Sequence, residues 1–156
     1  MKNNQIVWNV GRAVGERAPF SRAQVLTMAK RFRASKRWHD WALLATDVDT
    51  MLRSCDLLRL RVLDVSTGKG DVRTSFLWRQ KKTRRNTRMA LSQEARKALK
   101  RWIAESGKQS ADYLFTREKG RTAEPISYST YRRMVKTWLM EIGDDPADFS
   151  THSIRR

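Results

Sequence analysis

The sequence predicts a single α+β domain that is mostly helical. Three observations favour this class: several segments carry apolar residues at helical spacing, one short stretch alternates apolar and polar residues, and the order runs helices, strand pair, helices. A chain of 156 residues has the length of one ordinary domain. Its hydrophobic fraction of 40%, with six Trp and five Phe, supports a packed core and argues against disorder.

The amino-terminal half predicts an extended lead-in followed by helices. Residues 1–20 show no sustained period, so we expect the folded domain to cover 21–156. Ser21 is a good N-cap, and Gln24 three residues later completes a capping box for the first helix. A second helix is expected over about 36–48, and Ser54 is expected to cap a short third helix.

The middle and the carboxyl-terminal parts predict a hairpin and two further helices. Residues 72–79 alternate as a strand does, and 87–91 provide the returning strand after a basic turn. The clearest helix covers 92–106, because its apolar residues fill one stripe and Gly107 provides a C-cap. Another helix is expected from about Ser127.

The charge is the strongest compositional signal. Lys and Arg number 33 against 16 Asp and Glu, which gives a formal net charge of +17 and an isoelectric point near 11.0. A field of this sign concentrates polyanions and is typical of proteins that bind nucleic acids. Arg outnumbers Lys by 22 to 11, and the planar guanidinium suits bidentate contacts with phosphate. Composition does not separate DNA from RNA, or a binding protein from an enzyme.

Other classes of site lack support in the sequence. Cys55 is the only cysteine, so neither an intrachain disulfide nor a cysteine-based zinc site is expected. The glycines do not have the spacing of a phosphate-binding loop, and the carboxylates form no cluster suited to Mg²⁺. We therefore expect no cofactor and no metal. No signal peptide or membrane span is expected, and a cytoplasmic protein fits these features.

The basic turn of the hairpin is the densest cluster of positive charge. Most charge runs are solvated surface, but cations on one tight turn repel each other, so their retention favours contact with phosphate. The predicted phosphate-binding residues are Lys81, Lys82, Arg84, Arg85 and Arg88.

Three other residues are candidates for a phosphate site. His152 and Arg155 are three residues apart, so both lie on one face if a helix begins there. Arg53 precedes a predicted helix start, where it opposes the helix dipole unless it reaches into a cleft or pairs with Asp56. The other histidine, His39, is interpreted as a residue at the edge of the core that bonds to a neighbour.

These pieces together resemble the tyrosine recombinases, the phage-integrase family. The segment "LLATDVDTMLRSCDLLRLRVLDV" is similar to the first motif of that family, in which Arg53, Asp56 and Asp64 match. The segment "WRQKKTRRNTRMALS" resembles the family's hairpin, with Lys82 before Thr83 at the lysine position. The final "THSIRR" resembles the second box, His-x-hydrophobic-Arg. The resemblance covers about residues 21–156.

The resemblance implies a fold and a chemistry. The fold would be the catalytic core of the family, with a small antiparallel sheet. The family breaks a DNA phosphodiester without metal by attack of a Tyr, which leaves a 3′-phosphotyrosyl link. Arg53 and Arg155 would then stabilise the phosphate oxygens, Lys82 would act as general acid, and His152 would assist proton transfer. Asp56 would orient Arg53.

The sequence departs from the family after the second box, where the family continues to a third box and its nucleophilic Tyr. We therefore expect a catalytic domain truncated after the second box, with its carboxyl-terminal helices missing, that binds double-stranded DNA without cleaving it. Exposed apolar faces would favour self-association or pairing with full-length recombinase protomers. A bacterial or phage origin, associated with the nucleoid, would follow. Two alternatives stay open: a non-catalytic DNA-binding regulator or decoy, and an RNA-binding protein.

Overall fold

The structure is a computed structural model that describes residues 19–117 and 124–155. The helices in this part are α1 (Arg22–Ala34), α2 (Trp38–Thr50), α3 (Ser54–Leu57), α4 (Val62–Val65), α5 (Gln93–Ser106) and α6 (Tyr128–Glu141), with 3₁₀ helices η1 (Pro146–Asp148) and η2 (Thr151–Arg155). Two strands, β1 (Ser75–Arg79) and β2 (Asn86–Ala90), form an antiparallel sheet. The predicted fold class, mostly helical with a small antiparallel sheet, is confirmed.

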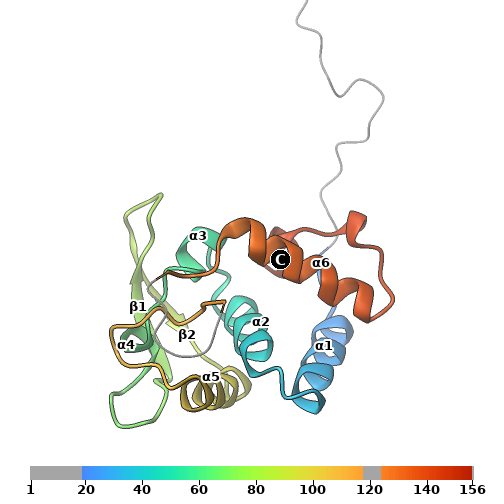
Figure 1. Ribbon diagram of the computed structural model, residues 1–156. Coiled ribbons are helices and arrows are strands. Elements are labelled where there is room, and N and C mark those ends of the chain that lie inside the picture. The colour runs from blue at the N-terminus through green and yellow to red at the C-terminus, as the bar shows by residue number, and fades with distance from the viewer. Residues whose placement is uncertain (1–18, 118–123, 156) are drawn as a thin grey trace, which may run out of the picture.

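Helix α2 lies at the centre of the fold. It packs against α1 and α5 and also contacts β2 and η2. Figure 1 shows α2 among the other helices, with the hairpin of β1 and β2 projecting at one side of the molecule. Of the predicted lead-in, residues 1–18 lie outside the described part of the chain. Within the described ranges, no helix has the length and apolar character to cross a membrane.

The helix starts and ends follow the capping residues. Ser21 Oγ accepts a hydrogen bond from the backbone N–H of Gln24 (3.1 Å), and Gln24 Oε1 accepts one from the backbone N–H of Ser21 (2.7 Å). This confirms the predicted capping box of α1. Helix α5 begins after Ser92, whose Oγ accepts from Ala95 N, and ends at Gly107 with φ +67°. The left-handed conformation at that position is what favours glycine there.

The first hairpin strand is shorter than the sequence predicts, and the second is displaced by one residue. Phe76 faces Met89 in the register, and both side chains are buried. The chain before Ser75 pairs elsewhere, because Arg73 N donates to Val65 O (2.7 Å) and Val72 forms an isolated bridge with Ser66. The alternating stretch 72–79, predicted as one strand, therefore contains an isolated bridge near α4 and the strand β1 that pairs with β2.

A buried polar contact joins α6 to α2. Tyr131 is fully buried, and its hydroxyl donates a hydrogen bond to Oδ2 of Asp47, which is also buried. A carboxylate inside an apolar core is stable only when donors satisfy it, so this contact sets how α6 lies on α2.

The Tyr131→Phe substitution should lower the free energy of unfolding by roughly 1–3 kcal/mol, because it removes a donor from a buried carboxylate. Urea titration followed by circular dichroism measures this loss. The control is Tyr128→Phe on the same helix, where the ring is 50% exposed. There the change should stay within about 0.5 kcal/mol. Equal effects of the two substitutions would contradict the role given to the Tyr131 contact.

Candidate functional site

Arg53 lies in the short connection between α2 and α3. Helix α2 ends at Thr50, and its C-cap Met51 is in the left-handed region with φ +50° and turns the chain toward α3. The predicted cap is wrong in one respect: Arg53 is the N-cap of α3, and Ser54 is its first helical residue. The half-buried Arg53 side chain donates from Nη1 to Oε1 of Gln80 on the hairpin (3.0 Å). A residue pair 27 positions apart is thereby joined.

Asp56 makes a second link to the hairpin. Its side chain is fully buried, and Oδ1 accepts a hydrogen bond from the backbone N–H of Lys81 (3.0 Å). The sequence predicts that Asp56 orients Arg53, and that role stays a prediction. In the structure the hydrogen-bond partner of the carboxylate is the hairpin. The α3 segment thus holds the base of the turn at two adjacent positions.

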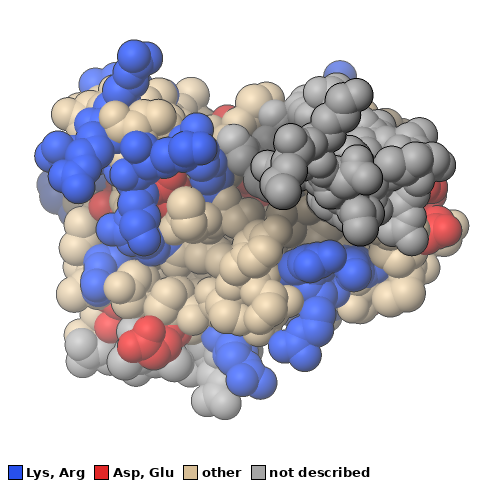
Figure 2. All heavy atoms as spheres, turned by 90° about the horizontal axis from the view of Figure 1, so that it is seen from above, with Lys and Arg blue, Asp and Glu red and all other residues tan. Residues whose placement is uncertain are grey.

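The basic turn begins at these two linked residues, Gln80 and Lys81. It is closed by hydrogen bonds from Arg84 N to Gln80 O (2.8 Å) and from Gln80 N to Arg85 O (3.0 Å), with Arg84 at φ +54°. Four predicted phosphate-binding side chains project from it into solvent: Lys81, Lys82, Arg84 and Arg85. In Figure 2, Lys and Arg gather over the side on which Figure 1 places the hairpin.

The fifth predicted residue of the turn lies elsewhere. Arg88 is within β2, opposite Leu77, and its Nη1 donates to Ser75 Oγ (3.0 Å). Its charge groups it with the turn in the sequence, although the returning strand predicted over 87–91 already contains it, and β2 places it in the sheet. Its guanidinium is exposed but follows the strands rather than the turn.

The second predicted box forms η2. Its backbone is anchored, since Ile154 is buried in the core and Ser153 O accepts from Phe20 N (3.0 Å). The helix contacts α2 and α6. The side chains of His152 and Arg155 lie outside the described part of the chain, so their predicted place beside Arg53 stays a prediction.

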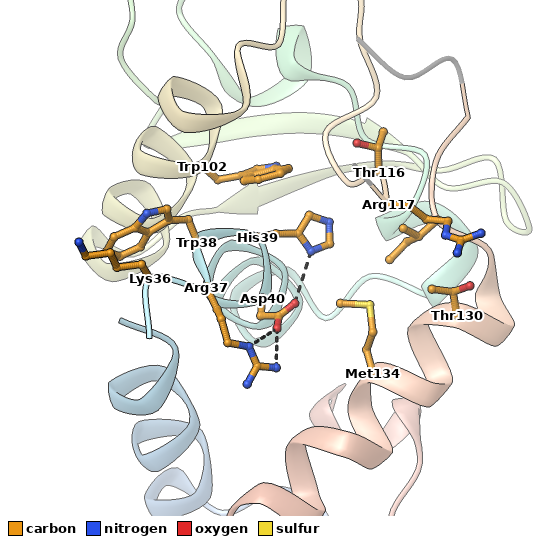
Figure 3. Close-up of a pocket in the computed structure, with 11 residues that line it drawn as sticks. Lys36, Arg37, Trp38, His39, Asp40, Trp102, Thr116, Arg117, Thr130 and Met134 are labelled. Atoms are coloured by element: carbon orange, nitrogen blue, oxygen red, sulfur yellow. Dashed lines mark hydrogen bonds and ion pairs between the residues drawn. The ribbon is translucent and has the colours of Figure 1, made fainter. Parts of the chain in front are cut away.

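A separate pocket of about 390 Å³ surrounds the other histidine (Figure 3). His39 Nδ1 is 3.5 Å from Asp40 Oδ1, and its ring meets Trp102 edge to face at 4.8 Å. Arg37 donates to Asp40 (2.8 Å) and to Glu141 (2.7 Å). Burial raises the pKa of the Asp40 carboxyl, but the hydrogen bond from His39 and the charge of Arg37 outweigh it, so the net pKa is lowered. His39 thus contacts its neighbour Asp40 through Nδ1, as the structural interpretation expected, while its buried Nε2 has no hydrogen-bond partner among the described residues.

Gln80 is the residue of this site that the sequence reasoning missed. Its Oε1 accepts from both Arg53 Nη1 and Thr83 Oγ1 (3.1 Å), and Nε2 donates to Thr87 Oγ1 (3.4 Å). A neutral residue between the basic positions gives no signal in charge or periodicity. The only available cue was its position immediately before the two lysines of the turn.

Comparison with known proteins decides the family. Residues 20–156 match the model described as the phage integrase family. The chain belongs to this family. The resemblance stated from the motifs of Arg53, the hairpin and the final box is therefore confirmed. A search of curated proteins gives no match.

Solved structures of tyrosine recombinases share the fold of this family member. XerA recombinase superposes with a TM-score of 0.69 at 17% identity over 92% of this chain and 48% of its own. The Tn1549 transposon integrase, in complex with circular intermediate DNA, superposes with a TM-score of 0.63 at 16% identity, over 90% of this chain and 50% of its own. Lambda integrase (residues 75–356), bound to DNA, superposes with a TM-score of 0.62 at 19% identity, over 92% of this chain and 50% of its own. The chain thus spans about half the length of these proteins.

The Asp56→Ala substitution should release the base of the hairpin turn. The backbone N–H of Lys81 loses its acceptor, so its hydrogen exchange should become at least about tenfold faster, the ratio that a loss of roughly 1.4 kcal/mol produces. Exchange measured by NMR tests this, with the amides of α5 as the internal reference. Unchanged exchange at Lys81 alongside unchanged α5 amides would contradict the link. A matched control is Asp64→Ala, a half-buried carboxylate that accepts from Arg61 N instead.

Proposed function

We propose that this chain binds duplex DNA through its phosphates, at a site built from Arg53, the hairpin turn and η2. The observation that carries the proposal is the pair of hydrogen bonds that fixes the α3 segment against a turn bearing four exposed cations. A net charge of +17 adds a long-range attraction for polyanions. DNA in the structures of lambda integrase and the Tn1549 integrase supports the choice of ligand.

The residue types fit the reaction of DNA strand exchange. In a phosphodiester under attack, negative charge grows on the non-bridging oxygens, and fixed guanidinium groups stabilise it. Arg53 and Arg155 take this role in the proposal. Lys82 protonates the leaving 5′-oxygen, and His152 assists proton transfer at the same phosphate. Asp56 supports Arg53 and the turn together. This chain matches about half the length of the solved recombinases. In the proposal, the complete reaction requires a protein of their full length.

The three tyrosines of the chain have other engagements. Tyr131 is buried on Asp47, and the Tyr113 ring lies under the Arg61 guanidinium at 4.0 Å. Tyr128 is exposed, with its hydroxyl 3.4 Å from Thr151 Oγ1. All three lie in elements where the family keeps no nucleophile. In the proposal a polypeptide of these 156 residues therefore binds DNA without cleaving it.

Affinity for duplex DNA should fall steeply with salt, because each phosphate contact releases counterions. Replacing Arg84 and Arg85 together by Ala should reduce the slope of log K against log salt by about 2 units. Fluorescence anisotropy with a labelled duplex measures the slope. The control replaces Lys36 and Lys97, two exposed cations of the α1–α2 turn and α5, and should leave the slope nearly unchanged. Arg53→Ala should barely alter the total affinity, since it removes one contact among many.

Equal slopes for the turn variant and the control would contradict the assignment of the turn. Stronger binding of structured RNA than of duplex DNA at matched salt would instead favour an RNA-binding function.

A polypeptide of these 156 residues should form no covalent adduct with a nicked suicide DNA substrate. Denaturing electrophoresis after incubation measures the product, with Tyr128→Phe as the matched variant because Tyr128 is the exposed tyrosine. An adduct in the wild type that disappears in Tyr128→Phe would overturn the prediction and identify Tyr128 as a nucleophile.

A further inference from the structure

Lys82 is held through both of its neighbours in the sequence. The N–H of Lys81 is bonded to buried Asp56, and the hydroxyl of Thr83 donates to Gln80 Oε1. The Lys82 side chain itself is exposed. An exposed lysine on a turn usually samples many orientations, but here the backbone on either side is fixed.

Gln80 joins this turn to Arg53. A carboxamide oxygen has two lone pairs, and Gln80 Oε1 uses them for Arg53 Nη1 (3.0 Å) and Thr83 Oγ1 (3.1 Å). Its Nε2 donates to Thr87 Oγ1 (3.4 Å), which fixes which end of the amide faces Arg53. One half-buried amide therefore contacts the α3 segment, the turn and β2 at the same time.

The neutrality of this acceptor matters for a phosphate site. A carboxylate at the same place would hold the guanidinium equally well, but it would also cancel the positive charge that attracts a phosphate. A carboxamide fixes one N–H of Arg53 and leaves the charge uncompensated. Among the described residues, Gln80 is the hydrogen-bond partner of the Arg53 side chain, and no acidic group forms an ion pair with it.

We infer that Gln80 is a positioning residue: it sets Arg53 relative to the turn that carries Lys82, so that both cations meet one DNA phosphate. This inference rests on the proposed function, since it needs a phosphate at this face. Gln80 acts through Arg53 and Thr83 and does not itself contact the ligand.

Side-chain NMR of the ¹⁵N-labelled 156-residue protein tests the inference. Guanidinium signals are recorded without and with a short duplex DNA, and the Arg53 signals are assigned from their loss in Arg53→Lys. In the wild type the bond to Gln80 should slow rotation of the guanidinium and separate its Nη signals, and DNA should shift them.

Two substitutions separate geometry from charge. Gln80→Met keeps the size of the side chain but removes the acceptor, so the Arg53 Nη signals should merge and the DNA-induced shift should fall by more than half. Gln80→Glu restores the acceptor, so the Nη signals should separate again, while the DNA-induced shift of these signals stays below the wild-type value because the carboxylate compensates the charge of Arg53. Gln93→Met, at the exposed first residue of α5, is the control and should match the wild type.

The outcomes distinguish the two proposals. Wild-type protein that does not bind duplex DNA contradicts the proposed function. Wild-type protein that binds DNA, with the same Arg53 signals and shift in Gln80→Met, overturns the inference about Gln80 alone. If Gln80→Met loses the hairpin amide signals, Thr83→Val provides the second test. It removes the hydroxyl that donates to Gln80 Oε1 and that also accepts from Arg85 N within the turn (3.4 Å), and it leaves the contact between Gln80 and Arg53 in place. It should therefore leave the Arg53 Nη signals separated and reduce the DNA-induced shift of the Lys82 side chain. An unchanged Lys82 shift would overturn the inference.

Discussion

The burial of the Asp56 carboxylate is the constraint on which the arrangement of this site depends. A fully buried acidic group requires a donor, and the donor is the backbone N–H of Lys81 at the base of a turn distant in sequence. The turn cannot leave the α3 segment without exposing or orphaning that carboxylate. A cluster of exposed cations that would otherwise repel each other on a free hairpin is thereby held against the body of the domain.

Helix α2 extends this constraint to the rest of the fold. Asp47 accepts from Tyr131 of α6, and Asp49 accepts from Ser92 N, at the start of α5 (2.6 Å). Two acidic residues, two positions apart, therefore fix one neighbouring helix each. The C-cap of the same helix, Met51, is in the left-handed conformation, and Arg53 follows two residues later. The position of Arg53 is consequently set by a helix whose own place is fixed on several sides.

The sequence predicted the elements well where local chemistry decides them. Ser21 and Gln24 are three residues apart and bond to each other, and the left-handed conformation that ends α5 belongs to Gly107 alone, so the local pattern contains both signals. Ser54 was misassigned because cap preferences favour Ser, whereas tertiary packing buries Ser54 and places Arg53 at the cap. Gln80 could not be found, because its partner Arg53 is 27 residues away and nothing in the intervening pattern records that contact.

In this site the charged acceptor bonds a neutral donor, and the neutral acceptor bonds a charged donor. The carboxylate of Asp56 accepts from a neutral backbone N–H, and the neutral amide of Gln80 accepts from the charged guanidinium of Arg53. The opposite assignment would satisfy the same hydrogen bonds but would neutralise Arg53. With the observed assignment, Asp56 fixes the turn from inside the core, where its charge faces away from solvent, while the exposed surface stays positive. In a cationic cluster, anchoring the cations with acidic side chains usually lowers the positive potential. Here Asp56 and Gln80 anchor the backbone of the turn and Arg53, and the charges of the cations remain uncompensated.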